Sequence, residues 1–125
     1  MKKNYAELIR AARKAVKNAY APYSGFKVGA AVLAGSGKIY AGANVENASY
    51  GLTVCAERIA VYKAIASGEK KITAAAVAAG SGAAYPCGAC RQVLSEFGKN
   101  IDVIIVKKNG HAIKKLSSLL PDAFR

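Results

Sequence analysis

The chain has 125 residues, of which 53 % are hydrophobic, and 19 Lys and Arg stand against seven Asp and Glu. This length suits a single domain over residues 1–125, and the apolar content excludes a disordered or collagen-like chain. The formal net charge of +12 indicates a solvated basic surface or, alternatively, a surface that attracts nucleic acid. We expect a cytoplasmic protein, because the sequence shows neither a secretory signal nor an apolar run of about 18 residues.

The first part of the chain predicts a helix followed by a hairpin. The helix covers residues 4–20, because apolar residues recur at helical spacing. These residues are Tyr5, Leu8, Ile9, Ala12, Val16 and Ala19. Pro22 ends this helix, since proline cannot continue its hydrogen bonds. Strands rich in Val and Ala are predicted over 27–33 and 38–42, joined by a Gly-Ser-Gly turn at 35–37.

Helices and strands alternate in the middle of the chain. Residues 43–54 form a polar loop without clear periodicity, and a helix follows from Cys55 to Ser67. A strand over 71–79 leads through a flexible connector to a second helix, which opens with Pro86 and ends at Phe97.

The last quarter of the chain predicts two more strands, over residues 102–106 and 111–115, with an Asn-Gly turn between them. A short helical turn over 117–120 follows. Strands that alternate with helices predict an α/β domain whose sheet includes some parallel pairing.

All three cysteines fall at predicted helix starts. Cys87 and Cys90 are three positions apart, so both thiols lie on one helix face and can bind one metal ion. Cys55 begins the other helix and can complete a three-thiolate site. A helix N-terminus suits such ligands, because its free N–H groups and dipole stabilise thiolates.

A three-thiolate site is typical of catalytic rather than structural zinc. Three protein ligands on Zn²⁺ leave a position for water, which is typical of a catalytic site, and the ion lowers the pKa of that water from ~15.7 to about 7. Glu57, two residues after Cys55, is the candidate proton carrier. The alternatives are a redox Cys-x-x-Cys pair, a structural zinc site completed by the single histidine, His111, or three unrelated buried thiols.

Five segments, in this order along the chain, carry a closer resemblance. They are APYSGFKVGAA at residues 21–31, NVEN at 44–47, CAER at 55–58, PCGACRQ at 86–92 and LLPDAF at 119–124. They resemble the corresponding segments of the small homotetrameric, zinc-dependent cytidine deaminases, and the match covers about residues 5–124. The two cysteine segments also fit the zinc nucleobase deaminase signature, with Cys in place of the usual His.

The resemblance implies a three-layer α/β fold, in which a mixed five-stranded sheet has helices on both faces. It implies one Zn²⁺ per subunit, and the ligands are Cys55, Cys87 and Cys90. Glu57 is the implied proton shuttle, and Arg58 donates hydrogen bonds to thiolate sulfur, although a surface ion pair is its ordinary role. The implied reaction is hydrolytic deamination of cytidine and 2′-deoxycytidine to uridine and 2′-deoxyuridine, with release of ammonia, in pyrimidine salvage.

The resemblance also implies how a nucleoside binds. Asn44 and Glu46 hydrogen-bond the ribose, Phe26 packs against the pyrimidine, and the backbone of Ala56 contacts the base. Without the resemblance, Asn44 and Glu46 are ordinary loop-capping residues, and the aromatic side chains of Phe26 and Phe124 are expected to be part of a core.

Subunit contacts follow from the same resemblance. Phe124 reaches into the pocket of a neighbouring subunit, and Tyr50 lies near a subunit boundary, so a homotetramer with shared active sites is expected. The alternative functions are a deaminase acting on a cytosine nucleotide or nucleic acid, which the basic charge favours, and a non-catalytic zinc module that binds RNA.

Overall fold

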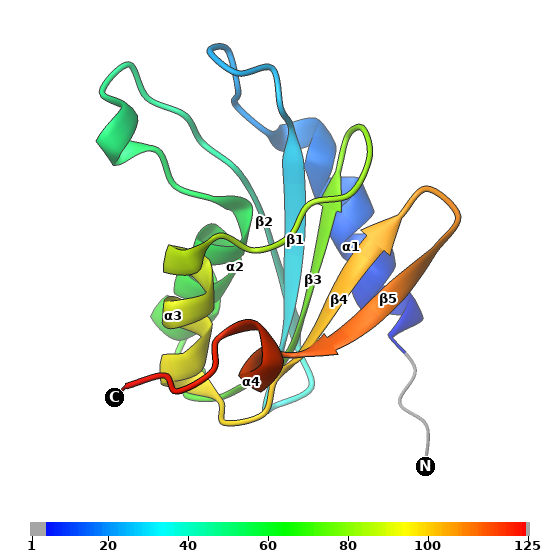
Figure 1. Ribbon diagram of the computed structural model, residues 1–125, viewed down its shortest axis with the longest axis vertical. Coiled ribbons are helices and arrows are strands. Elements are labelled where there is room, and N and C mark those ends of the chain that lie inside the picture. The colour runs from blue at the N-terminus through cyan, green and yellow to red at the C-terminus, as the bar shows by residue number, and fades with distance from the viewer. Residues whose placement is uncertain (1–4, 125) are drawn as a thin grey trace.

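A computed structural model describes residues 5–124 and shows a mixed five-stranded sheet with helices on both faces, as expected (Figure 1). The strands are β1 (Val28–Ala34), β2 (Ile39–Ala43), β3 (Ile72–Ala79), β4 (Asp102–Lys107) and β5 (Gly110–Lys115). Their spatial order is β2-β1-β3-β4-β5, with β3 and β4 parallel and the other pairs antiparallel.

The helices divide between the two faces of this sheet. They are α1 (Ala6–Ala15), α2 (Ala56–Ala66), α3 (Gly88–Phe97) and α4 (Leu116–Leu119), with 3₁₀ turns at Val16–Asn18 and Tyr50–Leu52. α1 covers one face, and α2 and α3 lie side by side on the other, as Figure 1 shows. Within residues 5–124, every helix is too short or too polar to cross a membrane.

Strand residues alternate between the two faces, as the pleat of a β-strand requires. In β3, Ala74, Ala76 and Ala78 contribute to the core beneath α1. Ala75 and Val77 contribute to the core beneath α2 and α3. Because β3 is buried on both faces, its sequence is a nearly continuous run of small apolar residues rather than an alternating pattern.

The first helix is shorter than its sequence pattern predicts. Its α-helical part ends at Ala15, and one 3₁₀ turn continues to Asn18. The chain then extends, because Tyr20 forms a parallel bridge with Val45, in which the Tyr20 N–H donates to the Asn44 carbonyl at 2.9 Å. A contact between distant segments therefore ends this helix before Pro22. Residue 4, where the helix was predicted to begin, lies outside the described residues.

The start of α3 also differs from the prediction. Pro86 lies before the helix rather than in its first turn, and Cys87 is the N-cap residue. The Cys87 thiol accepts a hydrogen bond from the Cys90 N–H at 3.4 Å, so a potential metal ligand also caps the helix. The predicted bounds of the other helices and strands are correct to within one or two residues.

We expect Tyr5→Phe to destabilise the fold by about 1–3 kcal/mol, because it removes a donor from a buried carboxylate. The Tyr5 hydroxyl donates to Asp102 Oδ2 at 2.6 Å, and Lys115 Nζ lies 2.6 Å from Asp102 Oδ1. Burial and this bond raise the pKa of Tyr5 above its usual value of about 10. The folded state then holds a proton that the unfolded state has lost, so stability should fall as pH rises above about 10.

Urea unfolding of both proteins at pH 7 and at about pH 10.5 tests this prediction. The unaltered chain should lose stability between the two values, and Tyr5→Phe should lose less. Equal stability of the two proteins at pH 7 would show that the Tyr5 hydroxyl contributes nothing to the fold.

Candidate metal centre and active site

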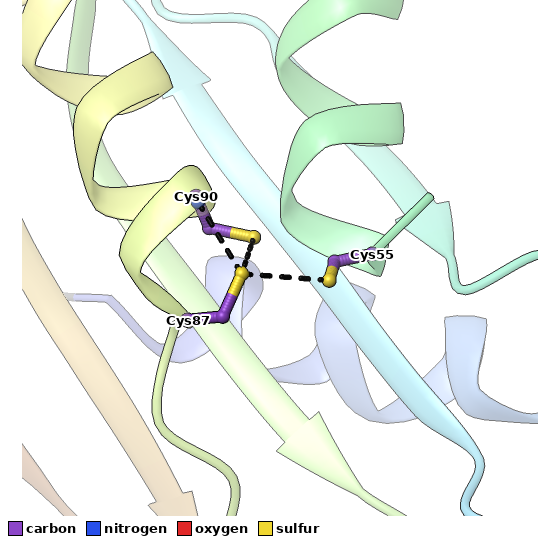
Figure 2. A group of neighbouring side chains, drawn as sticks. All are labelled: Cys55, Cys87 and Cys90. Carbon is purple, nitrogen blue, oxygen red and sulfur yellow. Dashed lines mark hydrogen bonds between the residues drawn. The ribbon is translucent and has the colours of Figure 1, made fainter. Parts of the chain in front are cut away.

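Three thiols meet where the N-termini of α2 and α3 lie next to each other (Figure 2). Cys55 is the N-cap of α2, Cys87 is the N-cap of α3, and Cys90 lies in the first turn of α3. The Sγ atoms of Cys55 and Cys87 are 3.7 Å apart, and those of Cys87 and Cys90 are 3.2 Å apart. All three sulfurs lie within 4.8 Å of one another. The helix-start spacing of the sequence therefore predicted a real cluster.

The geometry and chemistry of this cluster fit Zn²⁺. Zinc–sulfur bonds of about 2.3 Å in a tetrahedral arrangement place the sulfurs about 3.8 Å apart, close to the spacing here. Thiolates are soft ligands that select zinc among the abundant divalent ions. His111 lies on β5, paired with Val106, and does not belong to the cluster. Within residues 5–124, the group is three cysteines rather than a four-ligand structural site.

Arg58 contacts the cluster directly. Its Nη2 atom donates to Cys55 Sγ at 3.6 Å, so the ordinary alternative, a surface ion pair with a carboxylate, is not what the structure shows. Hydrogen bonds from Cys90 and from Arg58 lower the pKa of Cys55 to about 5, and the same Cys55–Cys90 hydrogen bond raises the pKa of Cys90. The cluster therefore favours thiolate at Cys55, as a metal ligand requires.

Glu57 lies in the first turn of α2 and is only 5 % exposed. The pKa of its carboxyl group is raised to about 7, mainly by burial and also by the negative charge of Cys55, although a backbone hydrogen bond and the positive charge of Arg58 act in the opposite direction. The Cys55 and Cys90 side chains both influence this pKa, so the carboxyl group lies beside the sulfur cluster. A carboxyl group with a pKa near neutrality can both accept and donate protons at physiological pH.

Asn44, directly after β2, uses its side chain to hold the start of β1. Its Oδ1 accepts the Val28 N–H at 2.9 Å, and its Nδ2 donates to the Phe26 carbonyl at 2.9 Å. The side chain is 8 % exposed. The loop-organising role considered for Asn44 is therefore present, whatever else this amide binds.

Glu46 organises the loop that precedes β1. Its Oε1 accepts the N–H groups of Tyr23 at 2.9 Å and Ser24 at 3.1 Å, and its Oε2 accepts the Ser24 hydroxyl. The Ser24 hydroxyl bond is the main reason that the pKa of Glu46 lies below its usual value. Glu46 also lines a pocket of about 320 Å³ with Tyr23, Ser24, Tyr50 and Thr53.

One short bridge connects these polar residues to the metal cluster. Val45, between Asn44 and Glu46, pairs with Val54 through two hydrogen bonds of 3.0 Å, and Cys55 follows Val54. The segment that carries Asn44 and Glu46 therefore runs beside the entry to α2. The segment between β2 and α2 extends beyond the sheet in Figure 1.

The remaining predicted site residues divide by exposure. Ala56 is fully buried at the start of α2, whereas Phe26 is 44 %, Tyr50 is 75 % and Phe124 is 79 % exposed. The alternative that Phe26 and Phe124 fill the core is therefore wrong. Phe124 lies beside α3, where its carbonyl accepts from Gln92 Nε2 at 3.3 Å, and it does not line the pocket beside Glu46.

Sequence reasoning gave no role to Tyr23, Ser24 and Thr53, which line the pocket beside Glu46. Ser24 binds the Glu46 carboxylate with both its backbone N–H and its hydroxyl. One feature of the sequence could have indicated this contact. Ser24 lies in the turn that follows Pro22, and its hydroxyl can donate a hydrogen bond to an isolated carboxylate such as that of Glu46.

We expect Gly42→Ala to destabilise the protein by about 1–3 kcal/mol and to lower its affinity for zinc. A Cβ at position 42 would lie 2.7 Å from the Ala60 nitrogen and 2.9 Å from the Ala56 oxygen, both in the backbone of α2. Relief requires α2 to move, and this helix carries Cys55. Thermal unfolding and competition with a zinc chelator test both effects. The control is Gly35→Ala, whose Cβ would meet Lys71 at 3.4 Å. Equal behaviour of the two variants contradicts the prediction.

Comparison with known proteins identifies the family of the chain. The profile of the cytidine and deoxycytidylate deaminase zinc-binding region matches residues 2–108. A cytidine deaminase of Sporosarcina psychrophila is 46 % identical over 121 residues, which cover 94 % of this chain and 89 % of that protein.

Solved structures agree in fold over nearly the whole chain. The crystal structure of cytidine deaminase from Burkholderia pseudomallei has a TM-score of 0.91 and 46 % identity, and covers 98 % of this chain and 100 % of its own. That of cytidine deaminase from Mycobacterium tuberculosis has a TM-score of 0.87 and 40 % identity, with 99 % of both chains covered. Together with the thiol cluster, these matches show that the chain belongs to the cytidine deaminase family and contains its zinc-binding deaminase domain.

Proposed function

We propose that the protein catalyses the hydrolytic deamination of cytidine and 2′-deoxycytidine to uridine and 2′-deoxyuridine, with release of ammonia. The observation that carries this proposal is a cluster of three thiols beside one buried carboxyl group, Glu57, whose pKa is about 7. Full-length similarity to cytidine deaminases supports the choice of substrate.

The proposed ligands of the zinc ion are Cys55, Cys87 and Cys90. When bound, zinc acts as a Lewis acid that makes a water molecule nucleophilic at neutral pH. Glu57 accepts a proton from the attacking water and delivers it to ring N3 of cytosine. Glu57 then passes the second water proton to the departing amino group, so that cytidine and water give uridine and ammonia. Arg58 offsets the negative charge of the sulfurs through its bond to Cys55.

The nucleoside site is proposed along the segment that carries Asn44 and Glu46. A carboxylate offers about four acceptor positions. The loop before β1 occupies three of those of Glu46, so one remains for a ribose hydroxyl. Asn44 supports the same role with the second amide hydrogen. The Ala56 N–H lies in the first turn of α2, where N–H groups lack helical partners, and is proposed to contact the base. Phe26, which is partly exposed, is proposed to stack on the pyrimidine.

We propose that residues 1–125 form one domain that assembles as a homotetramer with shared active sites. Elements from both ends of the chain join one three-layer unit, which supports a single domain. Tyr50 and Phe124 are mostly exposed in the single chain, so both rings are available for burial against neighbouring subunits. Light scattering should give four times the chain mass, and a monomer would overturn this assembly. The need for reduced thiols favours a cytoplasmic location.

Ultraviolet absorbance and ammonia release, measured side by side on four substrates, test the proposed function. The four substrates are cytidine, deoxycytidine, deoxycytidylate and a cytosine-containing single-stranded oligonucleotide. We expect turnover of the two nucleosides, and loss of activity after chelation that zinc restores. Preferred turnover of the nucleotide or the oligonucleotide would replace the proposed substrate class. Tight zinc binding without ammonia release would indicate a non-catalytic zinc module.

A further inference from the structure

A basic pocket of about 410 Å³ lies at the end of the sheet where β3 and β4 both finish. The pocket is lined by Arg13 of α1, by Lys107 at the end of β4 and Lys108 in the turn that follows, and by the glycine-rich residues 80–82 after β3. Figure 1 shows the loop after β3 and the β4–β5 turn at the same end of the sheet. β3 and β4 are parallel, and ligands of open α/β sheets bind outside the carboxyl ends of parallel strands.

No carboxylate balances the three positive charges. The residues that line the pocket include no Asp or Glu. Within residues 5–124, the one ion pair is Lys115–Asp102, so the side chains of Arg13, Lys107 and Lys108 are not paired with acids there. Like charges from two parts of the chain, Arg13 on α1 and the adjacent Lys107 and Lys108, repel one another unless an anion lies between them.

The pocket also offers oriented neutral donors. Arg13 Nη2 donates to the Lys107 carbonyl at 2.9 Å, which fixes the guanidinium group at the rim. Gly82 has φ +73°, and a Cβ added there would meet nothing within 4 Å, so its backbone is open to a ligand. The N–H groups of Ser81 and Gly82 donate to no acceptor among residues 5–124, although the Gly80 N–H donates to the Lys27 carbonyl. Backbone N–H groups beside cations are typical of phosphate sites.

We propose that this pocket binds a polyphosphate anion, either inorganic or carried by a nucleotide. An anion with several phosphates offers more acceptor oxygens than a single phosphate, which suits a pocket of about 410 Å³ lined by three cations and by loop N–H groups. The site lies on the α1 side of the sheet, whereas the thiol cluster lies with α2 and α3 on the other face. The loop that lines the pocket continues to Cys87, so occupancy can influence the metal centre. This inference does not depend on the proposed function.

Isothermal titration of the zinc-loaded protein with tripolyphosphate, and separately with ATP, tests the site. We expect saturable binding of one anion per chain. The variant Arg13→Ala/Lys107→Ala/Lys108→Ala should weaken binding at least ~10-fold, since each solvent-exposed charged contact contributes about a factor of two to three. Equal affinities for the two anions would mean that the site recognises phosphates alone, and tighter binding of ATP would add a contact to the nucleoside.

The matched control is Lys70→Ala/Lys71→Ala/Lys99→Ala, which removes the same charge near the amino ends of β3 and β4. It should change affinity by less than about twofold. Any zinc that the anion removes by chelation is lost equally from the unaltered protein and from the variants. The metal content of each protein is therefore measured before and after titration. The double variant Lys107→Ala/Lys108→Ala, which keeps the Arg13 bond, should still weaken binding at least ~3-fold. Absent saturation, or equal weakening in the two triple variants, overturns the proposal.

Discussion

Glu57→Gln is expected to lower the turnover of cytidine by at least ~10²–10⁴-fold, the usual contribution of a general acid–base group. The amide has nearly the same shape but cannot carry a proton between water and the base. Zinc binding should persist, because Glu57 is not one of the three thiol ligands. Steady-state kinetics with cytidine and zinc quantitation on the same samples make the measurement.

The matched control is Glu96→Gln on α3, where the same charge is removed from an exposed carboxylate. It should leave turnover within about twofold. Near-normal turnover of a zinc-replete Glu57→Gln protein would remove Glu57 from the proposed mechanism. If that protein instead lost its zinc, the loss of activity would carry no information on proton transfer, so metal content decides how the rate is interpreted.

Cys90→Ala is expected to abolish zinc binding and deaminase activity together. Cys90 is fully buried between Cys87 and the body of α3, so no solvent-exposed group can replace its sulfur. Two remaining thiols are too few for the three-ligand site that a catalytic zinc needs. Zinc per chain, measured after dialysis against a weak chelator, should fall from about one equivalent to a small fraction of that.

Retention of both zinc and activity in Cys90→Ala would exclude Cys90 from the ligand set. Loss of activity with full zinc content would instead give this thiol a role in positioning Glu57, whose pKa it influences. Circular dichroism of the variant shows whether α3 still forms, because the Cys90 side chain is part of the packing of that helix.

Local sequence patterns predicted most of the fold. Alternating and helical spacings depend only on which side chains face the core, so the bounds of β3 and α2 could be predicted to within one residue. The end of α1 could not, because the Tyr20–Val45 bridge that follows it joins segments far apart in sequence. The start of α3 was misplaced because Cys87, rather than a usual capping residue, accepts the first hydrogen bond.

In the candidate site, too, local sequence patterns predicted some features, whereas others depend on contacts between distant segments. Ligand type and spacing were enough to predict the thiol cluster, since positions 87 and 90 share a helix face wherever that helix lies. The partners of Glu46 were not predictable, because they are backbone N–H groups whose direction depends on how the loop before β1 folds. The burial that raises the pKa of Glu57 depends on packing between layers, which no local pattern contains.

The alanine-rich composition of β3 has a mechanical consequence. Alanine has no side-chain rotamers, so a strand built from Ala74, Ala75 and Ala76 cannot relieve added volume by turning a side chain. An enlarged residue there must displace a whole helix as a rigid unit. On the face covered by α2 and α3, that displacement reaches the sulfur cluster directly, because both helices begin at its ligands. Substitutions deep in the sheet can thus change metal geometry without touching the metal.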